Sequence, residues 1–107
     1  MDNNFMRIIA MFDLPVKTKK QVKEANTFRK FLIKDGYHMI QFSIYGRICN
    51  GQDSVQMHKS RLKYSVPKEG SIRVLTVTEN QYCNIDIMLG KKEKYDKDSN
   101  YDLISFF

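Results

Sequence analysis

The first third of the chain combines a strand-length apolar run with a helical pattern. Residues 5–12 (FMRIIAMF) are continuous in apolar character apart from one arginine, and Pro15 ends this run because proline cannot donate to a sheet ladder. Thr18 and Gln21 have the spacing of a capping box, which predicts a helix that starts near Thr18. Gly36 is expected to end that helix in a left-handed conformation.

Placed at about 100° per residue, the predicted helix has two different faces. The side toward the core is expected to hold the apolar residues Val22, Ala25, Phe28, Phe31, Leu32 and Ile33. The other side carries the lysines Lys19, Lys23, Lys30 and Lys34, and such a stripe is ordinarily just a solvated face. Arg29 projects into the apolar sector, where it either extends past the edge of the core or reaches an anion or a partner chain.

The middle of the chain alternates in the manner of a strand. Residues 37–48 exceed the usual strand length of about five or six, so a bend or a tight hairpin is expected inside this stretch. One face of it would carry His38, Ile40, Phe42 and Ile44. The turn at residues 50–51 leads into a second helix over about residues 53–65, which Pro67 stops. Its inward positions are expected to be Val55, Leu62 and Val66.

The last third begins with a β-branched strand at residues 71–78 (SIRVLTVT). One helical turn is expected at residues 79–83 and a short apolar strand at residues 85–89. Residues 91–100 are polar, with four lysines and three acids, and are typical of a linker. The apolar residues 101–107 (YDLISFF) favour a terminal strand that docks elsewhere, for example on another chain.

The order of these elements predicts an α+β fold. It fits a ferredoxin-like βαββαβ sandwich with an additional C-terminal strand. We therefore divide the chain into a core domain at residues 1–90 and a linker with a docking strand at residues 91–107.

Length and composition exclude several classes of protein. A chain of 107 residues with 42% apolar residues forms one domain, because two independent cores need roughly 200 residues. The sequence has no apolar run of about 20 residues and no basic secretory leader, so we expect a cytoplasmic protein with no membrane partner. Cys49 and Cys83 fit no metal-binding spacing and are expected to be free thiols.

The net charge of +6 is concentrated in the first two-thirds of the chain. Residues 1–66 have a net charge of +7, because twelve basic groups outnumber five acids, whereas residues 67–107 have a net charge of −1. A polyanion such as nucleic acid would therefore contact the first part of the chain. The candidate nucleic-acid-binding residues are Lys17, Lys19, Lys20, Lys23, Arg29, Lys30 and Lys34.

Asp13 is the strongest candidate for a metal ligand or catalytic residue, because it lies where the first apolar strand ends. A single carboxylate holds Mg²⁺ poorly, but a two-fold dimer would bring a second Asp13 to the axis and complete a metal site. A plainer alternative, in which Asp13 only caps the loop before Pro15, stays open. His38 and His58 are isolated, and each is expected to be a packed or half-exposed side chain rather than a ligand or a base.

Four segments in this order carry a family resemblance. They are residues 12–15 (FDLP), 28–32 (FRKFL), 39–45 (MIQFSIY) and 75–81 (LTVTENQ). Together they resemble the second of the universal CRISPR-associated proteins, the small "Cas-two" endoribonuclease family, and its type II members in particular. The resemblance covers about residues 5–90.

This resemblance implies a homodimer with a sheet-to-sheet interface and a C-terminal strand that reaches the partner protomer or the CRISPR integrase. It implies that Asp13 pairs across the dimer and binds Mg²⁺ or Mn²⁺, for cleavage of single-stranded RNA or double-stranded DNA. Ser43, Tyr45 and Arg47 are candidate catalytic residues that could assist if they lie near this metal. The alternatives are a non-catalytic scaffold that bridges integrase dimers along a protospacer duplex, and an RNA-cleaving toxin of the same fold.

Overall fold

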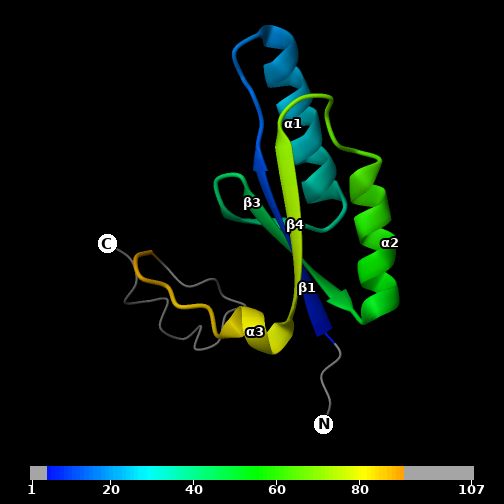
Figure 1. The fold of residues 1–107 in the computed structure, drawn as a ribbon, viewed down its shortest axis with the longest axis vertical. Coiled ribbons are helices and arrows are strands. Elements are labelled where there is room, and N and C mark those ends of the chain that lie inside the picture. Colours follow the sequence, from blue (N-terminus) through cyan, green and yellow to red (C-terminus); the bar gives the residue numbers. More distant parts are fainter. Residues whose placement is uncertain (1–4, 91–107) are drawn as a thin grey trace.

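The computed structural model of the protein describes residues 5–90, so residues 1–4 and 91–107 lie outside the described part. Its four strands form one antiparallel sheet in the order β2-β3-β1-β4, which is the ferredoxin-like topology that the sequence predicts (Figure 1). The elements are β1 (Phe5–Asp13), α1 (Lys19–Lys34), β2 (His38–Gln41), β3 (Ile44–Asn50), α2 (Gln52–Lys63), β4 (Ser71–Thr78) and α3 (Glu79–Cys83).

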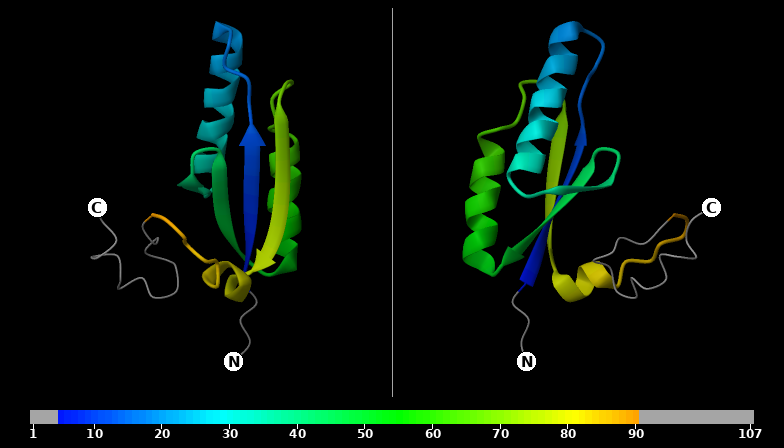
Figure 2. Two further views of the ribbon diagram at one scale, coloured as in Figure 1. Left: turned by 60° about the vertical axis from the view of Figure 1, so that its left-hand side comes forward. Right: turned by 180° about the vertical axis from the view of Figure 1, so that it is seen from behind.

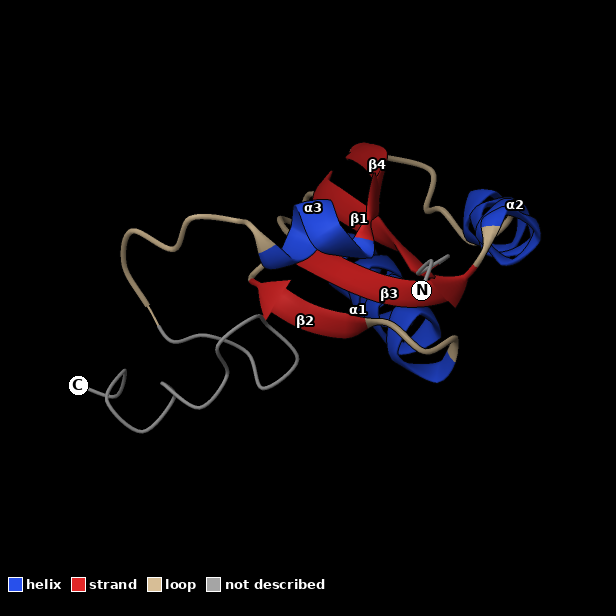
Figure 3. Cartoon of the chain, turned by 90° about the horizontal axis from the view of Figure 1, so that it is seen from below, coloured by secondary structure: helices blue, strands red, loops and turns tan. Residues whose placement is uncertain are grey.

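Within residues 5–90, helices cover one face of the sheet and leave the other face largely uncovered. Figure 3 shows α1 and α2 on one side of the sheet, and the loop of residues 84–90 that follows α3 on the other. Side chains alternate along β1, so Ile8, Ala10 and Phe12 enter the helix-covered core and are at most 6% exposed. The same core contains Phe28, Leu32, Tyr37, Tyr45, Cys49, Val55 and Leu62.

The predicted ends of α1 are confirmed by its caps. The backbone N–H of Gln21 donates to Thr18 Oγ1 over 3.1 Å, and the Gln21 side chain accepts from the Thr18 N–H over 3.1 Å, which completes the capping box. Gly36 follows the helix with a φ of 96°, a conformation that glycine adopts without a steric cost. These local signals were sufficient to locate the helix.

The predicted core face of α1 is too wide. Ala25, Phe28 and Leu32 are buried as expected, but Val22 is 40% exposed and Ile33 is 56% exposed. The helix contacts the sheet along a narrow stripe of residues three and four apart, so the apolar positions at the edges of that stripe stay in solvent.

The hairpin expected inside residues 37–48 is confirmed, because β2 ends at Gln41 and β3 begins at Ile44. The two residues between them form a tight turn, in which Ser43 has a φ of 66°. Phe42 was predicted to share a strand face with His38, but it lies in this turn and is 89% exposed. The side-chain alternation stops where the chain reverses.

The later elements follow the prediction with two exceptions. Val66 is 45% exposed rather than inward, because α2 ends at Lys63 before reaching it. Residues 85–89 form no strand, since α3 turns the chain across the uncovered face of the sheet and away from the free edge of β4 (Figure 2). The predicted linker and docking strand at residues 91–107 lie outside the described residues.

Two of the compositional expectations can be compared with the structure. Cys49 and Cys83 are both thiols that are not joined in a disulfide, as expected, and the Cys83 thiol donates to Glu79 Oε2 over 3.5 Å. Within residues 5–90, no helix combines the length and the apolar character that crossing a membrane requires.

Candidate active site

Asp13 is the last residue of β1 and its side chain is exposed. Because side chains alternate along a strand, Asp13 belongs to the same set as Ile9 and Met11, on the face of the sheet that α1 and α2 leave uncovered. It is paired in register with Ser71, the first residue of β4. The carboxylate therefore stands at one end of an open, mainly apolar sheet face.

Two loops hold the backbone around Asp13. A Cβ atom on Gly70 would lie 2.8 Å from the Asp13 carbonyl oxygen, and Gly70 has a φ of 112°, so this close approach requires glycine. On the other side, the Phe12 N–H donates to the Ser43 carbonyl oxygen over 2.9 Å. The loop before β4 and the turn between β2 and β3 thus hold the backbone at the end of β1 from both neighbouring strands.

The three predicted assisting residues are not brought together. Ser43 lies in the turn that contacts β1 beside Asp13. Tyr45 is 5% exposed, with its ring centroid 5.6 Å from that of Phe12 in the helix-covered core. The Arg47 guanidinium is also on the helix side. It donates from Nε to the Asp35 carbonyl oxygen over 2.7 Å and from a terminal nitrogen to the Ile48 carbonyl oxygen over 2.8 Å.

The catalytic roles of these three residues therefore stay predictions, and only Ser43 meets the condition of lying near Asp13. In this protomer Tyr45 acts as a core aromatic residue. Arg47 satisfies backbone carbonyl groups at the end of α1 and in β3, where an unpaired acceptor would be unfavourable.

Two residues at this end of the sheet were not among the predicted site residues. Arg73 is exposed on β4 and pairs with Met11, which places it diagonally across from Asp13 on the same sheet face. Phe42 projects from the turn between β2 and β3. To identify Arg73 and Phe42 as neighbours of Asp13, one needs to know which residues pair across the strands, and a single sequence does not show this.

The described residues offer a divalent metal one carboxylate at this place. They contain no group of three or more histidine, cysteine, aspartate or glutamate side chains that could hold a metal ion. Mg²⁺ is held by one or two carboxylates together with water and phosphate oxygens, so the exposed Asp13 carboxylate fits as one ligand of such a site.

The predicted nucleic-acid-binding lysines are exposed throughout. They are Lys17, Lys19, Lys20, Lys23, Lys30 and Lys34. Arg29 is half-buried, and its guanidinium carbon lies 5.7 Å from the centroid of the Phe12 ring. Two interpretations were left open for Arg29, and in the protomer its side chain extends past the edge of the core. Contact of these residues with nucleic acid stays a prediction.

Two buried ionic groups serve the fold. The Asp35 carboxylate binds His58 Nδ1 over 3.2 Å and also binds the Arg61 guanidinium, joining the end of α1 to α2. Burial opposes ionisation of Asp35, but the hydrogen bonds from Arg61 and His58 outweigh it and hold its pKa below the usual value. The predicted packing of His58 is confirmed, since it is 6% exposed.

The second buried group anchors α3 to the sheet. Arg7 Nε donates to Glu79 Oε1 over 2.7 Å, and the guanidinium carbon lies 4.1 Å from the Tyr82 ring centroid. Burial disfavours the charged guanidinium, but the hydrogen bond and the negative charge of Glu79 prevail and raise the Arg7 pKa. After α3, residues 85–90 run along the open face of the sheet.

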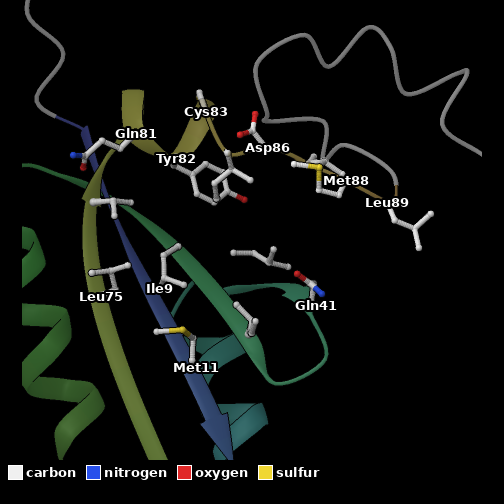
Figure 4. A pocket seen from close by; sticks show the side chains of 16 residues that line it. Ile9, Met11, Gln41, Leu75, Gln81, Tyr82, Cys83, Asp86, Met88 and Leu89 are labelled. Carbon is white, nitrogen blue, oxygen red and sulfur yellow. The ribbon is translucent and has the colours of Figure 1, made fainter.

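An apolar groove occupies the rest of that face, with a volume of about 880 Å³ (Figure 4). Its floor includes Ile9, Met11 and Leu75 from the sheet, and residues 85–90 form one wall. Leu75 is 52% exposed and Leu89 is 91% exposed. The groove and the carboxylate of Asp13 share one face of the protomer.

Comparison with known proteins adds a family to this geometry. Residues 6–85 match the family described as CRISPR associated protein Cas2. A protein of Acidovorax ebreus, named CRISPR-associated endoribonuclease Cas2, is 47% identical over 102 residues, which cover 95% of this chain and the whole of that protein. Proteins with the same name from Campylobacter jejuni and Ligilactobacillus salivarius are 41% and 42% identical. Those matches cover 96% and 83% of this chain, and 74% and 88% of the respective relatives.

Proposed function

This chain belongs to the CRISPR-associated Cas2 family, and from that premise we propose that it is a metal-dependent endonuclease that acts in CRISPR adaptation as a homodimer. Its substrate would be single-stranded RNA or double-stranded DNA, and its partner the CRISPR integrase. The observation that carries the proposal is the exposed Asp13 carboxylate at the end of β1, on the uncovered face of the sheet.

The proposed dimer joins the uncovered sheet faces of two protomers. This face exposes apolar side chains around the groove, including Leu75 at 52%. Such a surface is unfavourable in water and is typical of an interface. A two-fold axis near the end of β1 would place both Asp13 carboxylates at one site, and the partner's carboxylate would then be the second ligand of the metal.

In the mechanism we propose, Asp13 of each protomer would hold Mg²⁺ or Mn²⁺. The bound ion would supply an activated water and neutralise the charge that develops on the phosphate oxygens. Arg73 lies diagonally from Asp13 on the same face, where its guanidinium would pair with a neighbouring phosphate. The turn at Ser43 and the loop at Gly70 would keep the carboxylate in place.

The test is cleavage of labelled single-stranded RNA and duplex DNA by protein that has first been checked for dimerisation. The wild type and Asp13→Asn are compared with Mg²⁺, with Mn²⁺ and with EDTA. We expect cleavage by the wild type to require metal and to fall at least about 100-fold in the variant, because the ion contributes several kcal/mol of charge stabilisation. Asp53→Asn, which removes an exposed acid from the first turn of α2, is the matched control.

A non-catalytic scaffold is the second candidate, and the exposed lysines of α1 favour it. Lys19, Lys23, Lys30 and Lys34 give one helix a row of cations suited to a duplex backbone. In that case the protein would bind protospacer DNA and bridge integrase dimers, with residues 91–107 as the proposed integrase contact. Wild-type protein that binds duplex DNA but cleaves no more than Asp13→Asn would favour the scaffold over the nuclease.

A further inference from the structure

Phe42 is an aromatic side chain with an unusual position. It is 89% exposed at the tip of the turn between β2 and β3. A single exposed apolar side chain is ordinary by itself, and Tyr64 near the end of α2 is equally exposed at 90%. Phe42 differs from Tyr64 in its place, because the turn that carries it contacts β1 one residue before Asp13.

The backbone beneath this ring is held firmly. Ser43, the next residue, has a φ of 66°, and within residues 5–90 it is the only residue other than glycine with a positive φ. Its carbonyl oxygen accepts the Phe12 N–H over 2.9 Å. Backbone strain that surrounding contacts maintain is commonly associated with functional sites. The backbone that carries the Phe42 ring is therefore held in one conformation at the Asp13 end of the sheet. Figure 2 shows this turn beside the end of β1.

The same end of the sheet carries a cation on the opposite side of β1. Ser71 of β4 pairs with Asp13, and Arg73 lies two positions further along β4. From the β2–β3 turn across to β4, the surface thus offers an aromatic ring, a carboxylate and a guanidinium. On one nucleic-acid strand, the ring could stack on a base, the carboxylate could bind a phosphate through a metal ion, and the guanidinium could pair with a second phosphate.

We propose that Phe42 is a substrate-binding residue that stacks on an unpaired base at the Asp13 end of the sheet, and that this contact forms with or without a metal-bound phosphate at Asp13. In an intact duplex the base faces are covered by neighbouring bases, so a ring at this place can stack only on a single-stranded or frayed segment. The inference rests on the proposed function for the reaction itself. The stacking contact does not depend on cleavage, so it can be measured separately.

The experiment measures binding in the Asp13→Asn background with EDTA, where no cleavage takes place. The probes are a short single-stranded RNA that contains one 2-aminopurine and a blunt DNA duplex of the same length. Base stacking on an aromatic ring changes affinity by about 5- to 150-fold, so Phe42→Ala should weaken binding of the single strand by such a factor. It should also abolish the quenching of 2-aminopurine fluorescence that the ring causes, and leave duplex binding within about twofold.

Three further variants test whether the aromatic ring of Phe42 itself causes the binding and the quenching. Phe42→Tyr should keep the quenching, and Phe42→Leu should lose it although the side chain stays apolar. Tyr64→Ala should bind both probes as the parent protein does, because Tyr64 lies outside the proposed site. All variants are checked by circular dichroism and by light scattering for their oligomeric state.

The proposal is overturned if Phe42→Ala binds the single strand unchanged, or if it weakens both probes equally. It is also overturned if Phe42→Ala becomes monomeric, since the ring would then be a contact between protomers. If the wild type cleaves nothing but the single strand still depends on Phe42, the proposed nuclease function fails and the stacking contact stands.

Discussion

The Phe12 N–H donates a hydrogen bond to the Ser43 carbonyl oxygen over 2.9 Å, and this bond joins the turn between β2 and β3 to the end of β1. It does so while Ser43 has a φ of 66°, a conformation that costs an L-amino acid roughly 1 kcal/mol. The chain thus accepts local backbone strain directly beside the exposed carboxylate of Asp13. Ser43 is the one predicted assisting residue that lies at this place.

Substitutions at Ser43 should separate its backbone conformation from its hydroxyl. Ser43→Val should lower the free energy of unfolding by about 1–2 kcal/mol, because a β-branched residue is strained at positive φ. Ser43→Gly should change it by less than about 1 kcal/mol, since relief of strain and the added flexibility of glycine oppose each other. Urea denaturation measures both. Equal stability of the two variants would contradict this account of the turn.

Cleavage by the same variants then shows whether the Ser43 hydroxyl takes part in the reaction. Ser43→Val should also cleave less, because the turn beside Asp13 shifts. If Ser43→Gly cleaves as the wild type does, the backbone carbonyl accounts for the role of this residue. A loss of cleavage in Ser43→Gly at unchanged stability would instead assign a chemical role to the hydroxyl.

The proposed dimer makes a prediction at Leu75, which is 52% exposed in the groove on the uncovered sheet face. Leu75→Glu should leave the protomer folded but raise the dimer dissociation constant at least about 100-fold, because two unpaired carboxylates would be buried in the interface. Cleavage should fall together with dimerisation, since Asp13 would lose its partner.

The matched control for Leu75 is Met57→Glu, because Met57 is 53% exposed on α2 and lies away from that sheet face. Light scattering over a concentration series gives the oligomeric state of each variant. A wild type that is monomeric at every concentration, or a Leu75→Glu variant that remains dimeric, would contradict the proposed sheet-to-sheet interface.

Local signals in the sequence were sufficient for much of the fold but for less of the site. The capping box at Thr18 located α1 because its hydrogen bonds span only three residues. The neighbours of Asp13 depend instead on strand register, which pairs it with Ser71 and brings Arg73 to the same face. Tyr45 illustrates the same limit, since the sequence left open whether it lies near Asp13, and its side chain packs in the core on the other sheet face.

Acid should weaken the contact between α1 and α2 through Asp35. Because the folded-state pKa of this carboxyl is lowered, its contribution to stability is present above the unfolded pKa of about 4 and is lost as the pH falls through the folded value. Asp35→Asn should lower the free energy of unfolding by about 1–3 kcal/mol at pH 7, since it removes the charge that Arg61 and His58 bind.

The difference between wild type and Asp35→Asn should shrink progressively below about pH 4. Thermal unfolding between pH 2 and pH 7 measures this change. Asp53→Asn, at an exposed position in the first turn of α2, should differ from wild type by less than about 0.5 kcal/mol at pH 7. A stability difference for Asp35→Asn that is independent of pH would show that the charge of Asp35 contributes nothing.

The lysine face of α1 makes a prediction about salt. Each phosphate contact releases counterions, so the logarithm of duplex affinity should fall linearly with the logarithm of salt concentration. Replacing Lys23 and Lys30 by alanine should make that slope shallower by roughly one per lost contact. The control replaces Lys59 and Lys63, two exposed lysines of α2, which alters the net charge equally. If both double variants change the slope by the same amount, the protein attracts DNA through its overall charge and α1 is no specific surface.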